Sequence, residues 1–353
     1  MKLKTTLTLA IVALSTGYAG AQTQGVSKNE IVIGSIQDLS GPLAALGKQV
    51  RYGMQLRVDE LNEQSGGIHG RKIKLLIEDS QYDPKKAVLA AQKLVNQDKI
   101  FAMVAHIGTT NNLAAMPIQF AKNVPNLNPI TASKEMYEPF HKLKFAFSAS
   151  YYDQMRVYAP KVAKEKGAKK VCTLYQDDDF GAEVMQGAEA GLKTIGMTLA
   201  EKTTYKTGST DFSSQVARMK AAECDMVILG TVLRETIGTI GTARRTGYNP
   251  TFLGSSAAYF DLVHKLGGKA MDGLYAAMTV QNPYLDSASQ PLRFWATKYQ
   301  TKFNEEPAVF SVYGYTAIDN FITAATAAGP NLTTDAFIKA METVTFPADM
   351  FGS

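Results

Sequence analysis

Hydroxyl and amide side chains follow an apolar run in the first half of the chain. The run Ile100–Ala105 predicts a buried strand, and the segment 106–112 (HIGTTNN) comes directly after it. In that segment Gly108 precedes two hydroxyls, Thr109 and Thr110, at the start of an expected helix. A helix N-terminus attracts anions, because its backbone N–H groups are free and its dipole is positive there. The pattern predicts a carboxylate or other anion site, although a threonine that only caps the helix would have the same sequence.

Similar chemistry follows the next expected strand, which ends at Pro129-Ile130. Thr131 and Ser133 place two further hydroxyls on either side of Ala132, directly after that strand. In open α/β sheets, ligands bind beyond the carboxyl ends of the strands, so a site is expected among such post-strand residues. Hydroxyls at two successive strand ends therefore strengthen the prediction of an anion site.

The spacing of apolar residues predicts the elements that carry these loops. Over 50–61 apolar residues recur every three or four positions, as on one face of a helix, and over 73–77 they alternate as in a strand. Gly66-Gly67 is expected to end that helix and Asp83-Pro84 to start the next. Further strands are expected over 170–175, 198–205, 225–230 and 251–254, and further helices over 112–122, 212–222, 235–246, 292–303 and 313–328. Two runs of such alternation, with no low-complexity linker between them, predict two doubly wound α/β lobes.

The first 21 residues have the three parts of a secretory signal peptide. Lys2 and Lys4 form a basic start, residues 5–18 are apolar and small, and Ala19-Gly20-Ala21 supplies the cleavage pattern. We therefore expect export to the periplasm. No later segment has eighteen successive apolar residues, so the exported chain is expected to be soluble. Its formal charge falls from +5 to +3 without the two signal lysines, and no basic cluster remains, which argues against a nucleic-acid partner.

The sequence contains no complete catalytic or metal-binding motif. No metal-binding spacing occurs among the four histidines, which are His69, His106, His141 and His264. The segment 41–49 resembles a phosphate-binding loop, but five residues separate its glycines and Gln49 stands where Ser or Thr is required. The acidic run 177–179 favours a loop that caps a helix beginning near Gly181. We expect no enzyme activity, no metal and no cofactor.

The chain has two cysteines, each at the start of an apolar run. Cys172 begins one expected strand and Cys224 precedes another. A disulfide is possible if those strands are neighbours in an oxidising compartment. We favour two buried free thiols, because Cys packs readily as a small apolar residue.

Several landmarks, taken together in their order and spacing, resemble the periplasmic leucine/isoleucine/valine-binding proteins, which are type I substrate-binding proteins of ABC transporters. These landmarks are Ile31–Gly34, Leu39–Pro42, Gly47, Asn62–Gly70, Asp79, Asp83-Pro84, Asp178, Phe180-Gly181, Asp211-Phe212, Val216, Ala243-Arg244 and Gly247. The resemblance runs from about residue 29 to 330. It implies a type I periplasmic-binding fold, with two Rossmann-like lobes hinged around a cleft, and delivery of a ligand to an ABC permease.

The resemblance also implies boundaries for the two lobes. The expected first lobe covers 29–148 and is completed by 280–345, and the second covers 149–279. Residues 346–353 are expected to begin a final hinge crossing, and the chain is expected to be truncated there because members of the family continue further. A monomer is expected.

Carried over by position, the resemblance implies a set of ligand-binding residues. In the first lobe these are Thr109 and Thr110, which match the loop that holds the α-carboxylate, and Ile130, which matches a backbone contact, with Thr131 and Ala132 beside it. In the second lobe they are Phe180, Val232 and Ser256.

The second-lobe positions depart from the family pattern. An acidic residue that pairs with the ligand's ammonium usually stands where Ser256 is, and aromatic hydroxyls are missing at Phe180 and Val232. Arg234 has two interpretations, a second carboxylate contact or a surface arginine at a helix start. Three ligand classes remain, in descending order: a carboxylate without an α-amine, an amino acid, and a neutral amide such as urea. A sensory ligand-binding module and a two-domain enzyme are the alternatives to a transport receptor.

Overall fold

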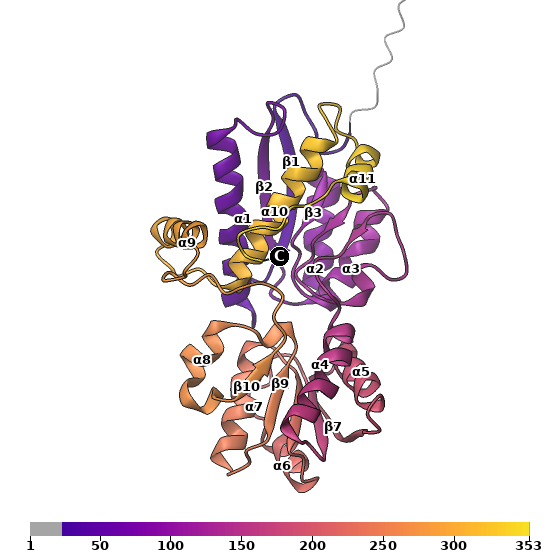
Figure 1. The fold of residues 1–353 in the computed structure, drawn as a ribbon. Helices are drawn as coiled ribbons and strands as arrows, with labels where there is room; N and C mark the ends of the chain where they lie inside the picture. Colours follow the sequence, from indigo (N-terminus) through magenta and orange to yellow (C-terminus); the bar gives the residue numbers. More distant parts are fainter. Residues whose placement is uncertain (1–22, 353) are drawn as a thin grey trace, which may run out of the picture.

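The computed structural model describes residues 23–352, so the expected signal peptide lies outside the described residues. The chain forms two lobes stacked end to end, each a five-stranded parallel sheet with helices packed against it (Figure 1). The prediction of two doubly wound α/β lobes is confirmed. Within the described range, no helix is long and apolar enough to cross a membrane.

The first lobe is built on a sheet in the order β2-β1-β3-β4-β5. Its strands are β1 Glu30–Gln37, β2 Lys72–Asp79, β3 Ala102–Val104, β4 Asn126–Leu127 and β5 Lys144–Phe145. β1 pairs with β2 along its whole length, from Glu30 opposite Lys72 to Gln37 opposite Asp79. The neighbouring strand β3 ends just before the hydroxyl loop that begins at His106, so that loop lies at the carboxyl edge of the sheet.

The helices of this lobe pack on the sheet or on the helices that cover it. They are α1 Ala44–Gln64, α2 Pro84–Gln92, α3 Thr109–Phe120, α9 Gln290–Phe303, α10 Val309–Ala327 and α11 Thr334–Thr343, with short turns of helix at Lys93–Gln97 and Lys134–Met136. The residues expected to end one helix and start the next do so. Gly66 and Gly67 have positive φ angles of 66° and 97° just after α1. The Asp83 carboxylate accepts a hydrogen bond from the backbone N–H of Lys85 at 2.7 Å and so caps α2.

The second lobe repeats the architecture with the order β10-β9-β8-β6-β7. Its strands are β6 Val171–Gln176, β7 Leu199–Tyr205, β8 Met226–Gly230, β9 Thr251–Gly254 and β10 Leu274–Ala276. Its helices are α4 Tyr151–Lys166, α5 Asp179–Lys193, α6 Ser213–Ala221, α7 Leu233–Arg245 and α8 Asp261–Gly267, with short turns at Ser256–Ala258 and Gly268–Met271. All of these elements fall between residues 149 and 279, the range expected for the second lobe. As expected, the Asp178 carboxylate caps α5 by accepting from the Gly181 N–H at 3.1 Å.

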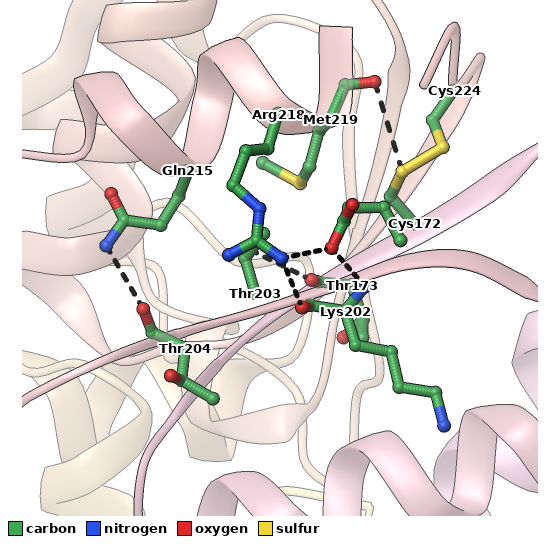
Figure 2. Close-up of polar contacts among 10 residues, drawn as sticks. Cys172, Thr173, Lys202, Thr203, Thr204, Gln215, Arg218, Met219 and Cys224 are labelled. Carbon is green, nitrogen blue, oxygen red and sulfur yellow. Dashed lines mark hydrogen bonds and ion pairs between the residues drawn. A yellow bond between two sulfur atoms is a disulfide. The ribbon is translucent and has the colours of Figure 1, made fainter. Parts of the chain in front are cut away.

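The expectation of two free thiols is wrong, because Cys172 and Cys224 form a disulfide (Figure 2). Cys172 lies in β6, and Cys224 lies in the turn that precedes the adjacent strand β8. Their Cα atoms are 5.8 Å apart, although 52 residues separate them in sequence. Both cysteines are buried, and it is the pairing of β6 with β8 that brings them together.

The chain passes between the lobes at residues 146–150 and again at 277–289. Residues 345–352 then return to the second of these crossings, where the Gln281 N–H donates to the Phe351 carbonyl at 3.0 Å. Phe351 is buried against Trp295 and Tyr315, with ring centroids 4.9 and 5.9 Å away. The last described residues are therefore anchored beside the second crossing between the lobes (Figure 1).

Helix α10 joins the first lobe, although more than two hundred residues separate it from α1 in sequence. The two helices cross with their backbones in contact, because glycines face each other at the crossing. A Cβ at Gly53 of α1 would lie 1.9 Å from the Ser311 carbonyl oxygen, and one at Gly314 of α10 would lie 2.2 Å from that of Val50. No other residue type fits at either position without separating the helices.

We expect the substitution Gly53→Ala to destabilise the protein by about 2 kcal/mol or more, because the added methyl group overpacks this crossing. Urea denaturation followed by circular dichroism measures the change. The matched control is Gly241→Ala in α7, where a Cβ would meet only the flexible Arg245 side chain at 3.3 Å. Helix propensity should make that variant neutral or up to about 1 kcal/mol more stable. Equal stability of the two variants would contradict this account of the crossing.

Candidate ligand-binding cleft

A cavity of about 40 Å³ lies between the two lobes, where the carboxyl ends of both sheets meet. Its walls come from both lobes and from the first crossing. The lining residues are Leu43, Leu46, Tyr82, Ile107, Gly108, Thr109, Ile130, Thr131, Ala132, Phe147, Ser148, Tyr151, Phe180, Val232, Ser256, Ala257, Phe310 and Tyr313. Seven of the nine predicted site residues are therefore brought together; Thr110 and Arg234 are not.

Two buried hydroxyls form the polar centre of the first-lobe wall. The Oγ1 atoms of Thr109 and Thr131 are 2.6 Å apart, so one hydroxyl donates to the other. A hydroxyl has one proton and two lone pairs. The mutual bond uses one of the two protons, and the other stays available to donate to an acceptor in the cavity. The two predicted hydroxyl loops thus act as a single donor site.

The backbone supplies a second attraction for an anion at the same wall. Helix α3 begins at Thr109, and no side chain among the described residues caps its N-terminus. Gly108, directly before it, has a φ of 92°, and a Cβ there would lie 2.7 Å from the Tyr82 ring. Only glycine satisfies both conditions, and the turn it makes aims the uncapped helix start at the cavity.

Ile130 lies in the cavity wall as expected, but its backbone is already paired. Its N–H donates to the His106 carbonyl at 2.8 Å, and its own carbonyl accepts from the Gly108 N–H at 3.2 Å. These bonds hold the two hydroxyl loops side by side. The Ile130 N–H is therefore not free for a ligand.

Tyr151 adds a third hydroxyl close to the threonine pair. It begins α4, and its N–H donates to the Ala132 carbonyl at 2.6 Å. Burial raises the pKa of Tyr151 to about 12, although the Ala132 backbone and the Thr131 hydroxyl oppose that shift. The phenol therefore keeps its proton at neutral pH and remains a hydrogen-bond donor.

The opposite wall is apolar. Phe180, Val232 and Ala257 come from the second lobe, and Ser256 contributes a single hydroxyl. The Phe180 ring packs edge-on against the ring of Tyr151 with centroids 4.9 Å apart. None of the lining residues has an acidic or basic side chain. A charged group on a ligand could therefore be balanced only by neutral donors and the start of α3.

The two remaining predicted residues point elsewhere. Thr110, one position along the helix from Thr109, donates across the cleft to a carboxylate oxygen of Asp178 at 3.5 Å. Arg234, in the first turn of α7, is exposed and does not line the cavity. This placement matches the surface interpretation of Arg234.

Sequence reasoning missed the aromatic part of the wall. Phe147 comes from the first crossing, and Phe310 and Tyr313 come from the start of α10. The Phe147 ring lies 4.6 Å from that of Tyr313, measured between centroids. A signal for Tyr151 did exist, since Ser150 before it is a typical helix cap. Nothing in the local sequence marks the other aromatic residues as neighbours of Thr109.

Other groups that could carry chemistry have structural roles. Lys48, in the segment that resembles a phosphate-binding loop, pairs with Glu305 at the surface. No group of acidic, His and Cys residues between 23 and 352 has a geometry that could hold a metal ion. His106, the first residue of the hydroxyl loop, is fully buried, and neither ring nitrogen has a hydrogen-bond partner in the described structure.

Comparison with known proteins assigns this architecture to a family. The family model described as "Periplasmic binding protein" matches residues 30–353. The chain is 23% identical over 314 residues to "Leu/Ile/Val-binding protein homolog 7" of Brucella abortus, covering 85% of this chain and 76% of that protein. It is 25% identical over 305 residues to "Amino acid binding protein" of Pseudomonas aeruginosa, covering 86% and 80%.

A solved structure shows the same fold. The "Fatty acid ABC transporter substrate-binding protein from Thermomonospora curvata" superposes with a TM-score of 0.86 at 24% identity, covering 94% of this chain and 85% of the other. The names of these similar proteins differ in the ligand they state, but the amino acids and fatty acids they name all have a carboxylate. The relatives are binding proteins, not enzymes.

The buried His106 should make the protein acid-sensitive. Burial lowers the pKa of His106 from 6.5 to about 3, so the folded state holds it neutral while the unfolded state protonates it. Above about pH 6.5 the histidine is neutral in both states and does not destabilise the fold. As the pH falls from there toward the folded-state pKa, only the unfolded state binds the proton, so the free energy of unfolding decreases progressively. In His106→Leu the free energy of unfolding should fall with pH less steeply, by up to about 1.4 kcal/mol per pH unit.

Urea denaturation between about pH 6.5 and about pH 4 measures this slope. The matched control is His264→Leu, at an exposed position of α8, which should keep the slope of the unsubstituted protein. An unchanged slope in His106→Leu would show that this histidine is not the acid-sensitive group.

Proposed function

The chain belongs to the periplasmic binding protein family, and we propose that it is the receptor of an ABC importer that captures a small carboxylate between its lobes and presents it to the permease. Family membership implies a periplasmic location. The observation that carries the proposal is the donor-rich side of the cavity. There the Thr109–Thr131 hydroxyl pair and the start of α3, both from the first lobe, converge with the Tyr151 phenol at the start of α4.

The lining chemistry favours a carboxylate without an α-amine. A carboxylate accepts hydrogen bonds and needs no positive side chain when a helix start and several hydroxyls donate to it. An ammonium would lie in an enclosed cavity whose wall contains no carboxylate, and burying an unpaired charge is costly. Ser256 occupies the position from which the family's usual acidic partner would act. The amino-acid ligands of two relatives are therefore the less favoured class for this chain.

The rest of the ligand is expected to be apolar and of modest size. Phe147, Phe180, Val232, Phe310 and Leu43 present carbon surface to the cavity. The void of about 40 Å³ leaves little room while the lobes stay in contact. A ligand must therefore enter when the lobes are apart and be enclosed as they close about the crossings. Closure then gives the permease a shape that depends on the ligand.

The hydroxyl pair gives a direct test of the carboxylate site. Thr109→Val should weaken binding of a carboxylate ligand about tenfold to a hundredfold, because one charge-assisted hydrogen bond is lost. Thr110→Val is the matched control, since this neighbouring side chain lies outside the cavity and its contact to Asp178 is long. Calorimetric titration of both variants measures the affinities. If the two substitutions weaken binding equally, or if Thr109→Val has no effect, the proposed contact between the Thr109 hydroxyl and the carboxylate is wrong.

Pairs of ligands that differ only in the amine test the ligand class. In a thermal-shift assay 4-methylpentanoate is compared with leucine, and 3-phenylpropanoate with phenylalanine. At equal concentrations we expect the amine-free member of each pair to stabilise the protein more, because its Kd is lower. A ligand at a hundredfold excess over its Kd stabilises the protein by about 2.7 kcal/mol. A larger shift with the amino acids would assign this chain to amino-acid binding, and a shift with urea alone would remove the carboxylate proposal.

A further inference from the structure

A buried carboxylate outside the cavity joins the two lobes. Glu183 lies on α5 of the second lobe, and only 2% of its surface is exposed. Its Oε1 atom accepts from the backbone N–H of Lys134 at 2.9 Å and from that of Tyr152 at 3.3 Å. Its Oε2 atom is buried and has no hydrogen-bond partner in the described part of the chain. A single oxygen thus receives donors from the loop of one lobe and from a helix of the other.

Both donors are free N–H groups at the start of a helical segment. Lys134 opens the short helical turn Lys134–Met136, and Tyr152 is the second residue of α4. N–H groups in the first turn have no acceptor within their own helix, so an outside acceptor must satisfy them. Glu183 does so for both segments, with its negative charge at the positive end of α4.

The Lys134 loop is also the loop that lines the cavity. Thr131 and Ala132 face the ligand space, and Lys134 follows two residues later. The loop belongs to the first lobe, while α4 and α5 pack together in the second lobe. A rotation about the crossing at 146–150 would separate Lys134 from Glu183 and would leave the Tyr152 contact in place. The Glu183–Lys134 bond therefore exists only while the Lys134 loop of the first lobe is in contact with α5 of the second.

The electrostatic surroundings of Glu183 oppose its charge. Burial raises its pKa to about 7, although the Lys134 and Tyr152 N–H groups and the nearby Ser133 hydroxyl act to lower it, and the Glu135 carboxylate adds to the rise. The titratable groups that face it are few. They are Glu135 on the loop and Tyr151 on α4, while the Lys134 ammonium lies over the Tyr152 ring at 5.5 Å. In the closed form the charged carboxylate is therefore destabilised by the loss of its hydration, and water would restore that hydration if the lobes parted.

We propose that Glu183 is a positioning residue that holds the Thr131–Lys134 loop against the second lobe and couples closure of the cleft to the uptake of one proton. It acts on the ligand through that loop and does not touch the ligand itself. The inference extends the proposed receptor function, since it concerns the closure on which capture depends.

The direction of the coupling follows from where the carboxyl is buried. In the closed form the pKa of Glu183 is about 7. When the lobes part, water reaches the carboxylate and its pKa falls toward the ordinary glutamate value. The closed form thus binds more protons between these two values, so closure is favoured as the pH falls through about 7 and disfavoured above it. Between about pH 5.5 and about pH 8 the ratio of closed to open form should fall roughly tenfold or more.

Lobe separation in the ligand-free protein tests this without knowledge of the ligand. Spin labels are attached through Lys122→Cys, past the end of α3, and Lys193→Cys, at the end of α5, both of which are exposed. The two native cysteines are joined to each other and do not react. Electron–electron double resonance then gives the distance distribution at each pH. The short-distance fraction should fall as the pH rises through about 7 in otherwise unsubstituted protein.

The decisive variant is Glu183→Gln, which keeps an acceptor oxygen for both N–H groups but cannot ionise. It should hold the short-distance fraction at its low-pH level throughout the titration. Glu189→Gln, on the same helix at an exposed site paired with Lys202, should behave like the unsubstituted protein. A short-distance fraction that does not change with pH, or that falls equally in Glu183→Gln, would overturn the proposal. Neither result would bear on the carboxylate ligand, which the calorimetric and thermal-shift measurements test separately.

Discussion

The carboxyl ends of two parallel sheets face each other across one gap, and the positions of the functional groups follow from this arrangement. Parallel strands all end at one edge, so the loops after β3 and β4 reach the gap from one lobe and those after β8 and β9 reach it from the other. The helices that follow these strands begin there as well. The gap is therefore surrounded by free backbone N–H groups, and each must find an acceptor in the protein or in a ligand.

The protein supplies acceptors at some helix starts and not at others. Asp178 caps α5, and the carboxylate of Glu183 accepts from the first turn of α4. The start of α3 has no such side chain among the described residues, and neutral hydroxyls surround it. Beside the gap, acids thus accept from the starts of α4 and α5 in the second lobe, while the start of α3 in the first lobe has no acidic acceptor. This contrast supports the proposed anion site on the first lobe.

Local sequence was sufficient for the elements and for part of the site. Periodicity and caps located most of the strands and helices, but not the short edge strands β5 and β10, and the hydroxyl loops led to Thr109 and Thr131. It could not separate Thr109 from Thr110, because neighbouring positions on a helix point about 100° apart and only tertiary packing decides which one faces the gap. It also could not identify Phe310, and it could not decide between free thiols and a disulfide for Cys172 and Cys224. In both cases the contact is made by elements far apart in sequence, α10 against the first lobe and β8 beside β6.

The separation of polar and apolar walls has a consequence for how closure is driven. An anion held by Thr109, Thr131 and the start of α3 keeps those contacts whether or not the second lobe approaches, since all three belong to the first lobe. What closure adds is burial of carbon surface against Phe180 and Val232, together with the Lys134–Glu183 contact. Burial of apolar surface is non-directional and scales with area. For the carboxylate ligand that we propose, the charged end therefore determines where it binds, and the apolar end determines how firmly the lobes close over it.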